Sequence, residues 1–225
     1  MNTKQKPVLK PLFPLIIVIL LIATILMISF IYDLHNYALW IKEDGVVEIL
    51  SALGYFLAAL QILLKGKWSY VTKYHYFFIL IIMFGLRELD FDKKFTTMGI
   101  FKIKFYLSSS VPTSEKLIGL LVISLIVYIC ITIIKNHSKD FFTKVKALSP
   151  IHIGVLIIFL VLLFSKAIDG LARKLGQLNI IIDQQTSIYF EVIEEILELG
   201  IPLLIMATLF IYFSKEKNEE LKIRS

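Results

Sequence analysis

The sequence contains a single cysteine, Cys130, so no disulfide can form within the chain and no cluster of thiolates can hold a metal ion. It also contains no P-loop, no Rossmann glycine pattern, no internal repeat and no low-complexity tract. Charged residues make up only 19% of the chain, and they interrupt long apolar runs. The common nucleotide-binding motifs and disulfide-stapled scaffolds are therefore not represented here.

Apolar residues dominate what is present. The hydrophobic fraction is 57%, above the roughly 45–50% of soluble domains, which argues against a soluble fold. A helix needs about 20 mostly apolar residues to cross a hydrocarbon core. Six such helices with short loops nearly use up the 225 residues, so we expect one all-helical integral membrane domain over residues 1–225 and no large soluble domain.

Six apolar runs are separated by connections rich in Lys, Asp, Ser and Gly. The first is too long for a signal peptide and has no small-residue cleavage site after it, so we interpret it as an uncleaved helix. The third and sixth reach a spanning length only if ionisable residues are included. The predicted spans are residues 12–31, 46–64, 74–89, 116–134, 151–170 and 191–213.

Basic residues fall unequally on the two sides that alternate spans define. The side holding both termini has fourteen and the other side has eight, so the positive-inside rule predicts that both termini are cytoplasmic. We expect a multi-pass protein of the cell (inner or cytoplasmic) membrane. The lysines are scattered among short loops, which explains the net charge of +6 better than binding to nucleic acid. The fourteen are Lys4, Lys6, Lys10, Lys65, Lys67, Lys73, Lys135, Lys139, Lys144, Lys146, Lys215, Lys217, Lys222 and Arg224.

The connection over residues 90–115 is the exception, because its lysines would lie on the outer side. From Phe101 to Tyr106, apolar residues alternate with lysine or tyrosine, which predicts a short strand or a segment lying at the membrane interface. Further on, Thr113 is a candidate N-cap for the fourth span, and Glu115 suits its first turn.

The sixth span carries acidic residues inside the membrane. Counting back about 20 residues from Phe213 places Glu194, Glu195 and Glu198 within the span, with Glu191 at its edge. At about 100° per residue the four lie on one helix face, which must point at protein or water. Pro202 removes the hydrogen bond to the carbonyl of Glu198, and it either exposes that oxygen beside the carboxylates or simply kinks the helix.

Three other spans place polar residues at the same, outer end. Span two begins with Glu48, and Ser51 and Tyr55 lie below it on the same helix face. Span three ends with Arg87, Glu88, Asp90 and Asp92. Span five ends with Ser165, Lys166, Asp169 and Arg173, and the last three share one helix face. Seven acids against two bases, Arg87 and Lys166, favour either protonation of some carboxyls or a bound cation. The alternative is a set of interfacial residues that pair between helices and reach toward headgroups. The candidate polar site comprises Glu48, Arg87, Glu88, Lys166, Asp169, Glu194, Glu195 and Glu198, with Glu88, Asp169, Glu194 and Glu198 as possible metal ligands.

The segments 43–48 (EDGVVE), 87–90 (RELD) and 194–199 (EEILEL) resemble a recurring pattern in small, uncharacterised bacterial multi-span membrane proteins. The resemblance extends over most of the chain and implies that these acids form one site, while the family has no established activity to carry over. Ceramidase-like and adiponectin-receptor-like hydrolases have a similar size, but their zinc site needs three histidines. Here the four histidines, His35, His75, His137 and His152, are expected at span ends on both sides of the membrane.

Three functions remain open. The first is a cation-binding or cation-moving protein, whose carboxylates hold protons or a hard divalent ion such as Mg²⁺, Ca²⁺ or Mn²⁺. The second is a membrane enzyme acting on a lipid at the outer leaflet, with carboxylates as general acid and base or as metal ligands and with Arg87 or Lys166 gripping a headgroup. The third is a non-catalytic assembly or sensory protein. Whether the protein is an enzyme stays undecided, and the expected partners are the bilayer and an ion or lipid ligand.

Overall fold

The computed structural model describes residues 9–31 and 45–224, and all regular structure in these residues is helical. Five of the described helices are long and apolar enough to cross a membrane, which confirms an all-helical membrane protein in its coarse outline. They are α1 (Leu9–Ile31), α3 (Val46–Lys73), α7 (Thr113–His137), α9 (Pro150–Ile168) and α11 (Gln184–Arg224). Their positions match five of the six predicted spans.

The remaining predicted span, over residues 74–89, corresponds to α4 (His75–Glu88). This helix has only 14 residues. At 1.5 Å per residue it is about 21 Å long, which is short of a hydrocarbon core of about 30 Å. The helix preceding it is longer than predicted, because α3 continues to Lys73 across a kink at Lys67, whose φ of 56° is left-handed.

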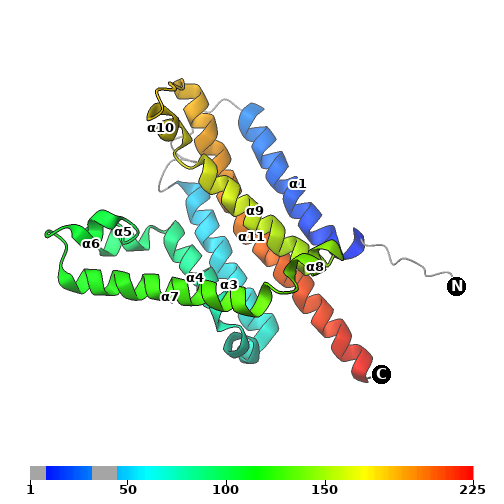
Figure 1. The fold of residues 1–225 in the computed structure, drawn as a ribbon. Helices are drawn as coiled ribbons and strands as arrows, with labels where there is room; N and C mark the ends of the chain where they lie inside the picture. The colour runs from blue at the N-terminus through cyan, green and yellow to red at the C-terminus, as the bar shows by residue number, and fades with distance from the viewer. Residues whose placement is uncertain (1–8, 32–44, 225) are drawn as a thin grey trace.

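Helix α11 is the centre of the bundle, and α1, α3 and α9 lie along it (Figure 1). One apolar cluster joins α11 to α1 and α9 through residues such as Leu15, Ile22 and Val192. A second joins α11 to α3 and α4 through residues such as Tyr55 and Ile81. Helix α7 runs at a steep angle to this bundle and packs mainly on α4, so much of its apolar surface is left facing outward.

Small residues allow close approach at two points on α11. A Cβ at Gly54 of α3 would lie 3.0 Å from the ring of Pro202, and a Cβ at Gly154 of α9 would overlap the buried side chain of Thr208. Close backbone contact through small residues is the usual way that membrane helices pack, since lipid tails are as apolar as leucine. These two contacts fix how α3 and α9 sit against the central helix.

Local sequence explains where several helices begin and end. Gly170, with a φ of 59°, ends α9 at Ile168 and starts the short helix α10 (Leu171–Gly176). At the start of α11, Asp183 accepts hydrogen bonds from the backbone and hydroxyl of Thr186 at 2.9 and 2.6 Å. These bonds stabilise the ionised carboxylate and hold the pKa of Asp183 below its ordinary value.

The predicted N-cap of α7 is wrong by one residue. Pro112 precedes the helix and Thr113 is its first helical residue, with no side-chain cap. Glu115 does lie in the first turn, as predicted, and its carboxylate accepts a hydrogen bond from the backbone of Thr97 at 2.7 Å. Proline suits this place because its ring fixes φ and it has no N–H to satisfy.

The segment between α4 and α7 forms two short helices, α5 (Phe91–Phe95) and α6 (Ile103–Leu107). The alternative of a short strand at residues 101–106 is therefore wrong; the alternating residues lie in a turn and in α6. Ile100, Phe105 and Val111 are buried together as a small core against α7. After the C-terminal end of α7, the short helix α8 (Phe141–Lys146) connects to α9.

Candidate functional site

One carboxylate oxygen on α11 contacts side chains of two other helices, α9 and α4. Glu198 of α11 is buried, and its Oε1 accepts a hydrogen bond from the hydroxyl of Ser165 at 3.1 Å and lies 2.6 Å from Nζ of Lys166, both on α9. The guanidinium of Arg87 on α4 lies 3.8 Å from the same oxygen. Glu198 is thus the hub of the polar cluster.

Lys166 lies among three carboxylates. Its Nζ is 2.6 Å from Glu198, 3.4 Å from Asp169 and 3.8 Å from Glu194. Asp169 caps the end of α9, whereas the two glutamates belong to α11. The ammonium group therefore has a close partner on the central helix and two others within reach.

The second base, Arg87, stands at the last turn of α4. Its Nη1 lies 3.8 Å from the buried carboxylate of Glu88, and its Nη2 lies 3.8 Å from Glu198. Arg87 itself is half-exposed, so the guanidinium links the buried acids to the surface. These long contacts are weaker than the close pair between Lys166 and Glu198.

The remaining predicted site residues lie around this centre. Glu48, in the first turn of α3, and Glu195 on α11 are half-buried, and each is within electrostatic range of Glu88 and of one another. Glu191, which was predicted at the edge of the sixth span, is exposed. Ion pairs and electrostatic interactions thus bring the eight candidate residues together at one end of the bundle.

One predicted member of a helix face does not share it. Arg173 was expected on the same face as Lys166 and Asp169, but Gly170 breaks the helix between them and Arg173 belongs to α10. The left-handed glycine turns the chain, so the i+7 spacing has no helical meaning there.

Two polar residues extend the picture beyond the predicted set. Tyr55, fully buried on α3, lies within electrostatic range of Arg87, Glu88 and Glu198. Gln61, one helical turn and a half further along α3, donates a hydrogen bond to the carbonyl of Met206 on α11 at 3.2 Å. Gln61 is the only amide in the apolar run from 52 to 64, and that isolation was the sequence signal for an interhelical hydrogen bond.

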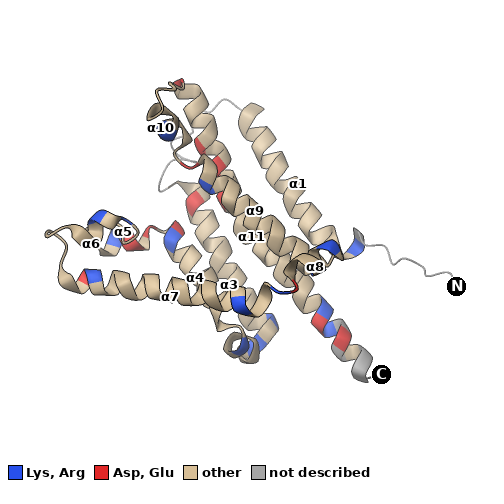
Figure 2. Cartoon of the chain, in the orientation of Figure 1, with Lys and Arg blue, Asp and Glu red and all other residues tan. Residues whose placement is uncertain are grey.

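The two ends of the molecule differ in charge (Figure 2). Acidic residues of α3, α4, α9 and α11 gather at the end where α9 finishes and α11 begins. Lysines gather at the opposite end, around the turn between α3 and α4, the end of α7, α8 and the C-terminal part of α11. With six acids and two bases, the candidate site has an excess of negative charge in an apolar bundle, where charge is poorly screened.

Among the described residues, no three His, Cys, Asp or Glu side chains are arranged to hold a metal ion. His75, His137 and His152 all lie at the lysine-rich end, where they bond to Tyr128, Tyr76 and Ser149 respectively. His35 lies outside the described residues. The histidine pattern of a zinc hydrolase is therefore not formed by the part of the chain that the structure describes.

Comparison of the chain with family models, with curated proteins and with solved structures finds no match.

Proposed function

We propose that the chain crosses the membrane six times, with α4 as the short third crossing and both termini in the cytoplasm. The directions of the helices support this topology, because α1 and α9 begin at the end of the bundle where α11 finishes (Figure 1). Lysines gather at this same end, and the positive-inside rule assigns a lysine-rich end to the cytoplasmic side (Figure 2). Tyr70, Tyr74 and Tyr212 form an aromatic group there, which suits a membrane–water interface.

Cysteine accessibility tests this orientation. In a variant whose only native cysteine is replaced, Cys130→Ser, a cysteine at Ser109 should react with an impermeant thiol reagent added outside intact cells. A cysteine at Asn136 should react only after the membrane is opened. Both positions are exposed in the structure, so each is reachable from its own side. The reverse labelling pattern would refute cytoplasmic termini and an outward-facing acidic site.

We further propose that the acidic site binds a cation from the outer side of the membrane, and that the proton is its simplest occupant. The observation that carries this proposal is the position of Lys166, one ammonium group among the carboxylates of Glu198, Asp169 and Glu194. The two positive charges of Lys166 and Arg87 cannot balance the six carboxylates of the site, and the apolar surroundings strengthen the interactions of the charge that remains unbalanced. A proton reduces this charge imbalance and needs less room than any other cation.

Glu194 is the member of the site that we expect to take up the proton, because Lys166 is 3.8 Å from it and already pairs with Glu198 at 2.6 Å. A neutral Glu194 no longer attracts the ammonium of Lys166, which is then shared by Glu198 on α11 and Asp169 at the end of α9. This change of partners alters the contact between α9 and α11, and it converts proton binding into a change in helix packing, the step that a proton-coupled carrier or sensor needs.

A proton suits the geometry better than a divalent ion. Mg²⁺ and Ca²⁺ need several oxygen ligands around one point, whereas Lys166 lies at the point that these carboxylates share. Ser165 does not suit the nucleophile of a lipid hydrolase, because it is fully buried and the carboxylate that accepts its hydrogen bond, that of Glu198, is already paired with Lys166.

Distance measurements between spin labels test the proposed exchange. Labels at the exposed positions Phe164 on α9 and Gln185 on α11, in the Cys130→Ser background, report the packing of these helices near the site in full-length protein in nanodiscs. The distance distribution should change with pH in this background and should be fixed in one form by Glu194→Gln, which imitates the neutral carboxyl. Glu219→Gln, at an exposed pair with Lys215, is the matched control and should still respond to pH. A pH-independent distribution in the parent, or an unchanged response in Glu194→Gln, would contradict the proposal.

A further inference from the structure

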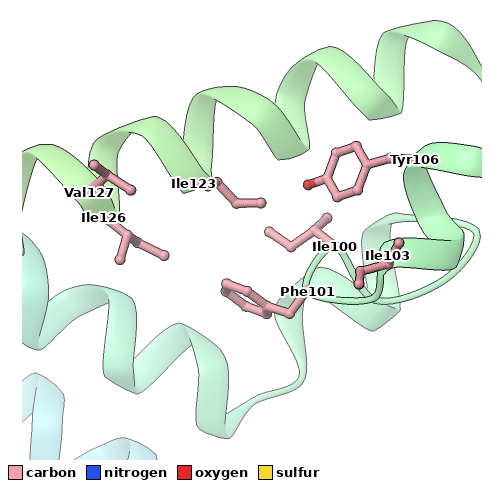
Figure 3. A pocket seen from close by; sticks show the side chains of 7 residues that line it. All are labelled: Ile100, Phe101, Ile103, Tyr106, Ile123, Ile126 and Val127. Carbon is pink, nitrogen blue, oxygen red and sulfur yellow. The ribbon is translucent and has the colours of Figure 1, made fainter.

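A cavity lies apart from the acidic site, between α7 and the segment that precedes it (Figure 3). Its volume is about 310 Å³, at the lower end of the roughly 300–1,000 Å³ typical of small-molecule sites. Six of its seven lining side chains are aliphatic or phenylalanine, and the seventh is Tyr106. The lining residues are Ile100, Phe101, Ile103, Tyr106, Ile123, Ile126 and Val127.

The phenol of Tyr106 is the polar feature of this cavity. Its oxygen is directed into the space between Ile100 and Ile123 (Figure 3). Among the described residues, this buried hydroxyl has no hydrogen-bond partner in the protein. A buried donor without a partner costs about 1–3 kcal/mol. An acceptor brought by a ligand would remove that cost.

The backbone of α7 keeps Tyr106 in this place. Gly119 lies against the ring, and a Cβ there would fall 2.7 Å from the phenol oxygen and 2.9 Å from Phe105. Phe105 is fully buried, so the short helix α6 is anchored on α7 by this residue. The position of the hydroxyl is thus set by packing rather than by a free side chain.

Two lysines adjoin the cavity lining in sequence. Lys102 and Lys104 are exposed and flank Ile103, which lines the cavity and is itself 77% exposed. Leu107, at the end of α6, is 80% exposed. A short helix whose exposed apolar side chains lie between lysines is typical of a segment at a membrane surface that carries anionic lipid.

From these features we propose that the cavity between α6 and α7 binds an anionic phospholipid of the surrounding bilayer. An acyl chain occupies the apolar cavity, an ester carbonyl of the lipid accepts a hydrogen bond from Tyr106, and Lys102 and Lys104 contact the phosphate. The cavity supplies apolar burial, the phenol supplies the one donor, and the lysines supply charge that complements the headgroup. This site is separate from the acidic cluster and does not depend on what the cluster binds.

Native mass spectrometry of the full-length protein tests the proposal, with phosphatidylglycerol and phosphatidylcholine of identical acyl chains as probes. The protein should retain phosphatidylglycerol in preference. The double variant Lys102→Gln/Lys104→Gln should lower its affinity by roughly thirtyfold, the factor expected for two basic residues at an anionic surface. The matched control, Lys135→Gln/Lys139→Gln, removes two exposed lysines, one in the last turn of α7 and one just after it, and should leave retention unchanged.

Two further variants test the cavity itself. Tyr106→Phe removes only the hydroxyl and should weaken binding roughly two- to tenfold, the range for one neutral hydrogen bond. Ile123→Trp fills the cavity and should lower retention of both lipids. If Ile123→Trp fails to fold, Tyr106→Phe and the lysine variants, which remove no packed apolar group, still decide. Equal retention of the two lipids by the parent protein, an equal loss in the control variant, or no effect of Tyr106→Phe would overturn the proposal.

Discussion

Replacing Lys166 with methionine should lower the free energy of unfolding by about 3 kcal/mol, because it leaves the buried carboxylate of Glu198 without its close partner. The expected loss of stability lies at the low end of the range for broken buried ion pairs, because 33% of the Lys166 side chain is exposed to solvent. Titration of the purified full-length protein with SDS in mixed micelles measures it.

A second substitution separates charge from packing. In Lys166→Met/Glu198→Gln the unpaired carboxylate is gone as well, so we expect more than half of the lost stability to return. Lys144→Met is the matched control; its pair with Asp140 is exposed, at 3.6 Å, and should be worth less than about 0.5 kcal/mol. Additive effects of the two substitutions at Lys166 and Glu198 would mean that the pair is not coupled, contrary to the described site.

The second large effect is expected from Gly154→Val, with a loss of about 2–3 kcal/mol from overpacking. A side chain at this position runs into Thr208, which is buried on α11 and held by a hydrogen bond to the carbonyl of Leu204 at 2.8 Å. Neither partner can move aside without shifting a helix. The same SDS titration measures the change.

Gly176→Ala provides the control for this glycine substitution. A Cβ at Gly176 has no atom within 4 Å, so the change should stay within about 0.5 kcal/mol. If Gly154→Val proved equally harmless, α9 and α11 would not pack as closely as described. The position of Lys166 beside Glu198 would then also be in doubt, because the same two helices carry both contacts.

The helical membrane fold follows directly from the sequence, because long apolar runs leave a backbone in lipid with few alternatives to the helix. Helix ends were harder to predict. Lys67 and Gly170 adopt left-handed φ angles of 56° and 59°, which kink α3 and end α9, and neither position stands out in an apolar pattern. The predicted third span, residues 74–89, also hid how short α4 is, because Arg87 and Glu88 were included to approach a spanning length and α4 has only 14 residues even with both.

The candidate site was predictable as a set of residues but not as a geometry. Periodicity placed Glu194, Glu195 and Glu198 on one face of a span, yet only helix packing decides that Glu198 contacts Lys166 while Glu195 lies among other carboxylates. The cavity beside Tyr106 had no sequence signal at all. It depends on how residues 98–107 fold against α7, and short irregular segments carry too little periodicity to show this.

Infrared spectroscopy of the full-length protein in nanodiscs tests the central claim, that the acidic site takes up a proton at Glu194, most directly. The carbonyl stretch of a protonated carboxyl group reports proton uptake without a label. We predict a protonated-carboxyl band that grows as the pH is lowered from alkaline through neutral, that is diminished in Glu194→Gln, and that is unchanged in Glu219→Gln. A band of the same size in Glu194→Gln and in the unsubstituted protein, or no such band near neutral pH, would contradict the account.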